Sequence, residues 1–319
     1  MSSVTDLVSG LRSGDRRAVA RLISLVEDGA AEASDVIREV YPLTGHASTV
    51  GITGAPGSGK SSLIDGLVHR MRSADLAVGV IAVDPTSPFS GGALLGDRVR
   101  MQAHALDEKV FIRSMATRGH LGGLSLAAPE AMRVLEAAGS DFVVVETVGV
   151  GQSEVEVAKQ ADTTIVVLAP GMGDAIQAAK AGILEVADIF CVNKSDKPGA
   201  SDTARDLRSM LEMGEGRDAD WSIPIVMTSA TAEDGIDELW EAIRAHEAHL
   251  REGGRLEARR RARFSAEIRE IVGERLKSAL EKAAGADVFE KLTDDVLERK
   301  LDPYSAADEL MKRLRLIER

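Results

Sequence analysis

The chain has 319 residues, of which 44% are hydrophobic and 28% are charged, the usual balance of a soluble globular protein. Aromatic residues make up only 3% and the formal net charge is -12, which argues against nucleic acid and against an anionic membrane as partners. The single cysteine, Cys191, cannot form an internal disulfide, and neither a signal-peptide core nor an apolar stretch of about eighteen residues is present. We therefore expect a cytoplasmic protein.

The first predicted elements are short amphipathic helices over residues 4–41. Val19, Leu22, Ile23 and Val26 form one apolar stripe at helical spacing. We expect residues 1–45 to form a helical N-terminal extension.

Seven apolar, strand-like runs then alternate with helical stretches. Apolar runs at this spacing are typical of a parallel sheet covered by helices on both faces. The sequence therefore predicts an α/β domain with a mostly parallel sheet over residues 46–250. The runs are 49–53, 77–83, 109–115, 141–147, 163–169, 188–193 and 223–229, and Cys191 in the sixth run is expected to be a small buried residue.

Beyond Asp234 only helices are expected, and residues 251–319 are predicted to form a C-terminal helical arm. An apolar stripe at four-residue spacing favours two alternatives equally, packing against the chain's own nucleotide domain or pairing of two arms in a dimer. A basic run in the same helix is best explained as a solvated face. The stripe is Phe264, Ile268, Val272, Leu276 and Leu280, and the basic run is Arg255, Arg259, Arg260, Arg261 and Arg263.

The segment GAPGSGKS at 54–61 matches the phosphate-loop pattern and stands between a strand and a helix, as this motif requires. Its glycines let backbone N–H groups surround phosphate oxygens at the positive end of the following helix. Lys60 supplies charge to the β- and γ-phosphates, and Ser61 supplies a hydroxyl to Mg²⁺. The predicted nucleotide-binding residues here are Gly54, Ala55, Pro56, Gly57, Ser58, Gly59, Lys60, Ser61 and Ser62.

A second motif, Asn193-Lys194-Ser195-Asp196, ends the sixth strand-like run. The Asp196 carboxylate can accept from two N–H donors of guanine, a pair that adenine does not offer, so ATP would leave it unpaired. Ser229 and Ala230 end the next run, where a backbone amide can approach guanine O6. These residues predict a preference for GTP and GDP.

The fourth strand ends in Glu146, with Gly149 three positions later and Val150 directly after it. Ras-like GTPases place a water-orienting Gln at that following position. Gln152 lies just beyond and reaches the site only if the glycine-containing loop moves. We therefore expect slow hydrolysis by the free protein.

Two other functions fit these motifs less well. A nickel-delivery GTPase needs a cluster of metal-binding Cys or His, and this chain has one Cys and six scattered His. A P-loop kinase acting on a small molecule commonly prefers ATP, and the N-K-x-D segment argues against that preference. The kinase remains the alternative function.

With these motifs in place, the sequence resembles the MeaB/ArgK family, whose members are GTPase chaperones of adenosylcobalamin-dependent acyl-CoA mutases of the methylmalonyl-CoA mutase type. The resemblance covers nearly the whole chain. It rests on GAPGSGKSS (54–62), VDPTSPFSGGALLGDRVRM (83–101), TRGHLGG (117–123), VVETVGVGQSE (144–154) and GILEVADIFCVNKSD (182–196).

The resemblance implies a P-loop NTPase fold with a helical N-terminal extension and a C-terminal dimerisation arm, and therefore a homodimer. It also implies that GTP hydrolysis gates cofactor loading and protection of a mutase, and that the mutase activates the GTPase. Our hypothesis is that a bound mutase orders the loop after Glu146 together with residues 174–185. One departure is Ala181, which stands where the family usually has a second lysine. The implied Mg²⁺ ligands are Ser61, Asp84, Asp97 and Glu146, with a helix N-cap as the alternative for Asp97, and the implied catalytic residues are Lys60, Asp84, Glu146, Gly149 and Gln152.

Overall fold

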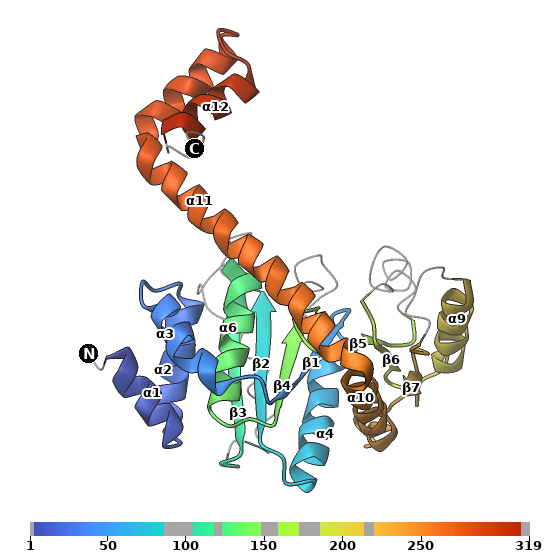
Figure 1. Ribbon diagram of the computed structural model, residues 1–319. Helices are drawn as coiled ribbons and strands as arrows, with labels where there is room; N and C mark the ends of the chain where they lie inside the picture. Colours follow the sequence, from blue (N-terminus) through green and yellow to red (C-terminus); the bar gives the residue numbers. More distant parts are fainter. Residues whose placement is uncertain are drawn as a thin grey trace. The chain divides into compact units, whose positions relative to one another are not determined.

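The strand-like runs form one sheet in the computed structural model of the protein (Figure 1). The structure describes residues 3–85, 104, 106–117, 123–147, 159–171, 186–213 and 220–313. The strand order is β3-β2-β4-β1-β5-β6-β7 and all neighbouring pairs are parallel, which confirms the predicted α/β class. The strands are β1 (Ser48–Gly54), β2 (Val78–Pro85), β3 (Val110–Thr117), β4 (Phe142–Thr147), β5 (Thr163–Leu168), β6 (Ile189–Val192) and β7 (Ile225–Met227).

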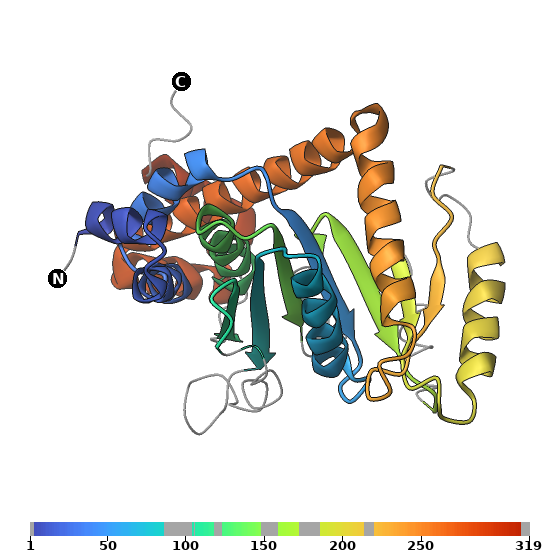
Figure 2. The same cartoon turned by 90° about the horizontal axis from the view of Figure 1, so that it is seen from below.

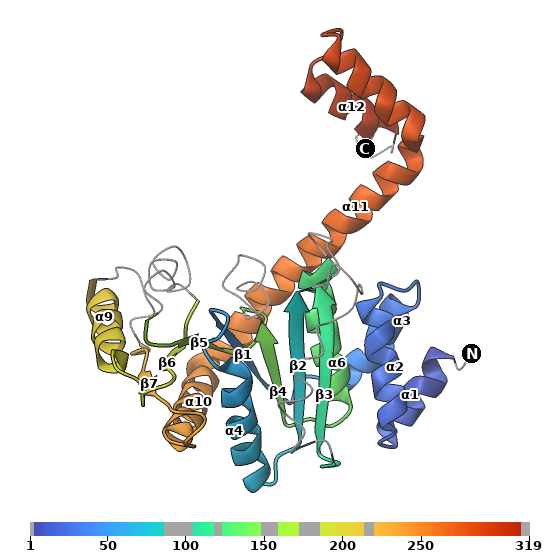
Figure 3. The same ribbon diagram turned by 180° about the vertical axis from the view of Figure 1, so that it is seen from behind.

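Helices cover both faces of this sheet (Figure 3). Val143 and Val145 of β4 pack against the helices on one face of the sheet, while Val144, between them, packs against the helices on the opposite face. Because each strand is covered on both sides, its residues are apolar without alternation, which is why the runs were visible in the sequence. The helices are α6 (Gly123–Ala137) and α9 (Ala200–Met213) on the first face, and α4 (Lys60–Ser73) and α10 (Ile236–Arg251) on the second.

Cys191 on β6 is fully buried, as expected for a small core residue. Its thiol lies 3.1 Å from the Thr228 hydroxyl. Burial raises the pKa of the Cys191 thiol to about 12, so the group stays protonated at neutral pH.

The N-terminal segment packs on the outer side of α6. Ser3 caps the first helix and Asp15 caps the second by accepting from the Arg17 amide, which explains where both begin. The predicted stripe of four apolar residues on the second helix is buried, as expected. The elements are α1 (Val4–Arg12), α2 (Arg16–Glu27), α3 (Ala33–Val40) and the 3-10 helix η1 (Tyr41–Leu43).

The chain divides into two compact units, Met1–Arg260 and Arg261–Arg319. The 3-10 helix η4 (Glu252–Gly254) leads into α11 (Arg255–Leu297), and α12 (Pro303–Arg313) folds back beside the end of α11 (Figures 1 and 3). Within the second unit, three members of the predicted apolar stripe are exposed, Ile268 at 62%, Val272 at 49% and Leu276 at 39%. Among the described residues, none of the helices combines the length and the apolar character needed to cross a membrane.

The prediction of a solvated basic face is wrong for two arginines at the start of α11. Arg259 donates to both carboxylate oxygens of Asp188 at 2.9 and 2.7 Å. Arg260 does the same with Asp162, at 3.1 and 2.7 Å. Asp162 and Asp188 directly precede β5 and β6, so these paired charges hold the first turns of α11 to the edge where the strands begin.

Candidate functional site

The phosphate loop joins the end of β1 to the start of α4. At two of its positions only glycine fits, because neighbouring atoms lie too close for a Cβ. Gly54 has φ +147°, and a Cβ there would lie 2.1 Å from the Val167 carbonyl oxygen. Gly59 has φ +93°, and a Cβ there would lie 2.3 Å from Asn193 Nδ2. Any larger residue would push the loop away from β5 or from the segment after β6.

Lys60, the first residue of α4, is buried inside this loop. Its Nζ donates to the carbonyl oxygens of Gly54 at 2.8 Å and Ala55 at 3.2 Å. Ser58 is buried, while Pro56 and Gly57 at the tip are exposed. The loop therefore encloses a cation at the positive end of a helix, an arrangement suited to anionic oxygens.

Ser61 and Glu146 meet directly beneath the loop. The Ser61 hydroxyl donates to Glu146 Oε1 at 2.8 Å, and Glu146, at the end of β4, is only 1% exposed. Ser62 follows in the same first turn of α4 and is half-buried. A hydroxyl and a carboxylate side by side are a hard-oxygen donor set, the kind that Mg²⁺ uses in nucleotide sites.

Asn193 connects the phosphate loop to the segment after β7. Its Nδ2 donates to the Ser58 carbonyl oxygen at 2.8 Å, and its Oδ1 accepts from Thr228 Oγ1 and from the Ala230 amide, both at 3.2 Å. Lys194 has φ +59°, and its Nζ donates to the Gly57 carbonyl oxygen at 2.7 Å. The two sequence motifs thus form one hydrogen-bonded site.

Asp196 lies at the open side of this site. The Ser229 hydroxyl donates to Asp196 Oδ1 at 2.9 Å and holds the pKa of that carboxyl below its usual range. The carboxylate is therefore ionised at neutral pH and can accept two hydrogen bonds from a base.

Two further positioning residues were missed by sequence reasoning. Gly235 has φ +74°, and a Cβ there would lie 2.1 Å from the Met227 carbonyl oxygen. Asp234 exchanges two backbone hydrogen bonds with Ser229, at 2.9 and 3.2 Å. Together they close the turn that presents Ser229 and Ala230, and the Asp-Gly pair is a turn signal that could have revealed them.

The remaining predicted site residues are only partly described. Asp84 lies at the carboxyl end of β2, next to β4, where Ala82 pairs with Glu146 and Val83 with Thr147. Its backbone is therefore on the same edge of the sheet as Glu146. The predicted residues Asp97, Gly149 and Gln152 lie outside the described residues.

The site has a glycine-rich loop around a buried lysine, and this loop is hydrogen-bonded to the N-K-x-D segment that follows β6. These two features define a P-loop protein that binds guanine nucleotides. The family model described as "Methylmalonyl Co-A mutase-associated GTPase MeaB" matches residues 19–285. The chain belongs to this family and is a GTPase.

Curated relatives carry GTPase names, and a solved structure shares the fold. A Pyrococcus abyssi protein that carries a provisional GTPase name is 50% identical over 313 residues, which is 98% of this chain and 97% of the relative. A Caenorhabditis elegans protein named "Methylmalonic aciduria type A homolog, mitochondrial" is 33% identical, covering 97% of this chain and 82% of its own length. A crystal structure titled "LAO/AO transport system kinase" superposes with a TM-score of 0.74 at 28% identity, covering 98% of this chain and 97% of that one.

Proposed function

We propose that this GTPase is a chaperone of an adenosylcobalamin-dependent acyl-CoA mutase of the methylmalonyl-CoA mutase type. In this role it hydrolyses GTP to GDP and phosphate, and hydrolysis gates the loading and protection of the mutase cofactor. The family description names methylmalonyl-CoA mutase, and the nematode relative is named after methylmalonic aciduria. The structural observation that carries the GTPase part is the joining of the phosphate loop to the base motif through Asn193.

Different residues of the chain bind the phosphates and the base of GTP. The loop amides and Lys60 take the phosphate oxygens, because a desolvated ammonium and a helix N-terminus both stabilise negative charge. Asp196 takes the guanine edge, with Ser229 and Ala230 beside it. In this assignment the hydrogen bonds of Asn193 set the distance between the phosphate subsite and the base subsite.

Mg²⁺ is the cation that this site would hold. The Ser61 hydroxyl and the Glu146 carboxylate fit it, because they are adjacent oxygen donors buried at the phosphate end of the site. Asp84 and Asp97 are the further proposed ligands. A bound Mg²⁺ supplies charge neutralisation on the β- and γ-phosphate oxygens.

Restraint of hydrolysis is the second part of the proposal. Val150 stands where a Ras-like GTPase has its water-orienting Gln. In our proposal the bound mutase orders the loop that carries Gly149 and Gln152, so that GTP is hydrolysed rapidly only when the client protein is present.

We also propose that the protein is a homodimer paired through the C-terminal arm. The support is the exposure of Ile268, Val272 and Leu276 on one stripe of α11, since a row of exposed large apolar side chains marks an association surface.

The direct test of the chaperone role is co-purification of the tagged full-length protein with the host's cobalamin-dependent mutases in the presence of GTP. We expect one such mutase to be retained. Lys60→Ala serves as the matched control, because it should lose nucleotide binding and hydrolysis while the fold is kept. Failure to retain any cobalamin-dependent mutase, with GTP binding intact, would contradict the chaperone role.

A further inference from the structure

A cleft lies where β1, β4 and β5 begin, at the edge of the sheet opposite the phosphate loop. In Figure 2 the arrow of β1 points away from this edge, toward the loop before α4. The cleft has a volume of about 330 Å³, within the range of roughly 300–1,000 Å³ found for small-molecule pockets. Its walls are residues 45–48, the end of α10 and the first turns of α11, all in the first compact unit.

The floor of the cleft is apolar and preformed. Four of its side chains are buried parts of the core, and a fifth, from α11, is half-buried. An apolar ligand body placed here would leave water without requiring the core to rearrange. The floor consists of Val50, Phe142, Ile243, Leu250 and Leu256.

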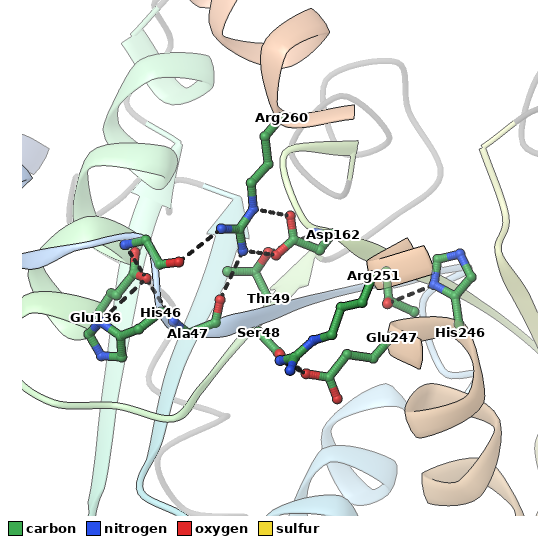
Figure 4. Close-up of polar contacts among 12 residues, drawn as sticks. His46, Ala47, Ser48, Thr49, Glu136, Asp162, His246, Glu247, Arg251 and Arg260 are labelled. Atoms are coloured by element: carbon green, nitrogen blue, oxygen red, sulfur yellow. Dashed lines mark hydrogen bonds and ion pairs between the residues drawn. The ribbon is translucent and has the colours of Figure 1, made fainter. Parts of the chain in front are cut away.

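The carboxylates near the cleft are already engaged by the protein (Figure 4). Asp162 is bound by Arg260, which also donates to the carbonyl oxygens of Gly45 and Ala47 at 3.1 Å each. Glu136 accepts from the amides of the same two residues, at 2.7 and 2.8 Å. These groups shape the rim and leave little capacity for a cationic ligand.

The rim of the cleft has more hydrogen-bond donors than its carboxylates engage. Glu247 is held by Ser48 and by two arginines, Arg244 and Arg251, of which only Arg251 lines the cleft, so the charge of Glu247 is already balanced. The Arg251 side chain is 63% exposed and lines the cleft, and among the described residues its guanidinium donates to Glu247 at 2.6 Å. A guanidinium has five N–H donors, so most of those of Arg251 remain available to a ligand.

We propose that this cleft binds a small monoanion with an apolar body, such as a medium-chain carboxylate, whose carboxylate accepts from Arg251 and whose chain lies on the apolar floor. Because Leu256 and Arg260 of α11 both line the cleft, the ligand contacts the start of α11 as well as the sheet edge. Binding would therefore hold the first turns of α11 in place, at a site separate from the nucleotide.

The test is calorimetric titration of the full-length protein with octanoate, with the uncharged octanol as the comparison. Arg244→Ala is the matched control for Arg251→Ala, because both remove one ion pair with Glu247 but only Arg251 lines the cleft. We expect saturable octanoate binding that is kept in Arg244→Ala and about tenfold or more weaker in Arg251→Ala, since a charge-assisted hydrogen bond is lost. Octanol should bind correspondingly weakly, and GTP binding should be unchanged in both variants.

Amide hydrogen exchange provides a second readout. Octanoate should slow exchange at residues 45–48 and 255–260 in the wild-type protein and in Arg244→Ala. The proposal is overturned by the absence of saturable octanoate binding, by equal affinity for octanol, or by equal weakening in the two variants.

Discussion

Asn193→Ala removes the side chain that joins the two halves of the nucleotide site. Three hydrogen bonds of 3.2 Å or shorter are lost, to the Ser58 carbonyl oxygen at 2.8 Å and from Thr228 Oγ1 and the Ala230 amide at 3.2 Å each, and a longer one to the Gly59 carbonyl oxygen at 3.5 Å is lost with them. At about 1 kcal/mol net for each of the three shorter bonds, the loss totals roughly 3 kcal/mol. That corresponds to about 100-fold in an equilibrium constant.

The loss divides between folding and binding, because the bonds both stabilise the folded loops and set their spacing. We expect the free energy of unfolding to fall by about 1.5 kcal/mol. GTP affinity should also fall, by about tenfold or more, since each 1.4 kcal/mol is a factor of ten. Urea unfolding and titration with a fluorescent GTP analogue measure the two effects.

Thr228→Val is the matched control, because it loses one of the bonds to Asn193, together with the 3.1 Å contact to the Cys191 thiol, and keeps the others. It should cost about 1 kcal/mol. If Asn193→Ala has the same free energy of unfolding and the same GTP affinity as the wild type, the idea that this side chain holds the site together is refuted.

Three further predictions concern base choice, pH and assembly. Asp196→Asn should weaken GTP binding but not ATP binding, since only guanine pairs with the carboxylate, and an unchanged GTP-to-ATP affinity ratio would count against the base assignment. Burial lowers the pKa of His246 from 6.5 to about 4, so the unfolded state binds more protons between these values. Unfolding free energy should then drop by up to about 1.4 kcal/mol per pH unit as pH falls from 6.5 toward 4, and His246→Gln, compared by urea unfolding, should flatten this slope. The wild-type protein should be a dimer in light scattering, and Ile268→Asp with Val272→Asp should be a monomer; a wild-type monomer at micromolar concentration would exclude the dimer.

The sheet could be predicted from the sequence because its strands are covered on both faces. Each strand is then a continuous apolar run, and the observed bounds differ from the predicted ones by only a few residues, as for β6 at Ile189–Val192. The phosphate loop and the base motif were also visible, since both are short patterns at strand ends.

The contacts between distant segments could not be predicted. Asn193 bonds to Ser58 across 135 residues, and no periodicity encodes which strand ends become neighbours. The same reason explains Arg259 and Arg260, which look like a solvated basic run until β5 and β6 bring Asp162 and Asp188 beside them. His246, one of six scattered histidines in the sequence, is buried in the structure, with its Nδ1 2.9 Å from the Thr163 hydroxyl.

The central claim is that GTP hydrolysis by this protein is restrained until a mutase is bound. Single-turnover hydrolysis of GTP with and without the cognate adenosylcobalamin-dependent mutase tests it most directly, in the wild type and in Gln152→Ala. Completion of a GTPase site by a partner is worth about 10³–10⁵ in rate where an arginine is supplied, and less where a loop is only ordered. We predict slow hydrolysis by the free protein, clear acceleration by the mutase, and loss of that acceleration in Gln152→Ala. A fast free enzyme, or a rate that the mutase leaves unchanged, would contradict the account.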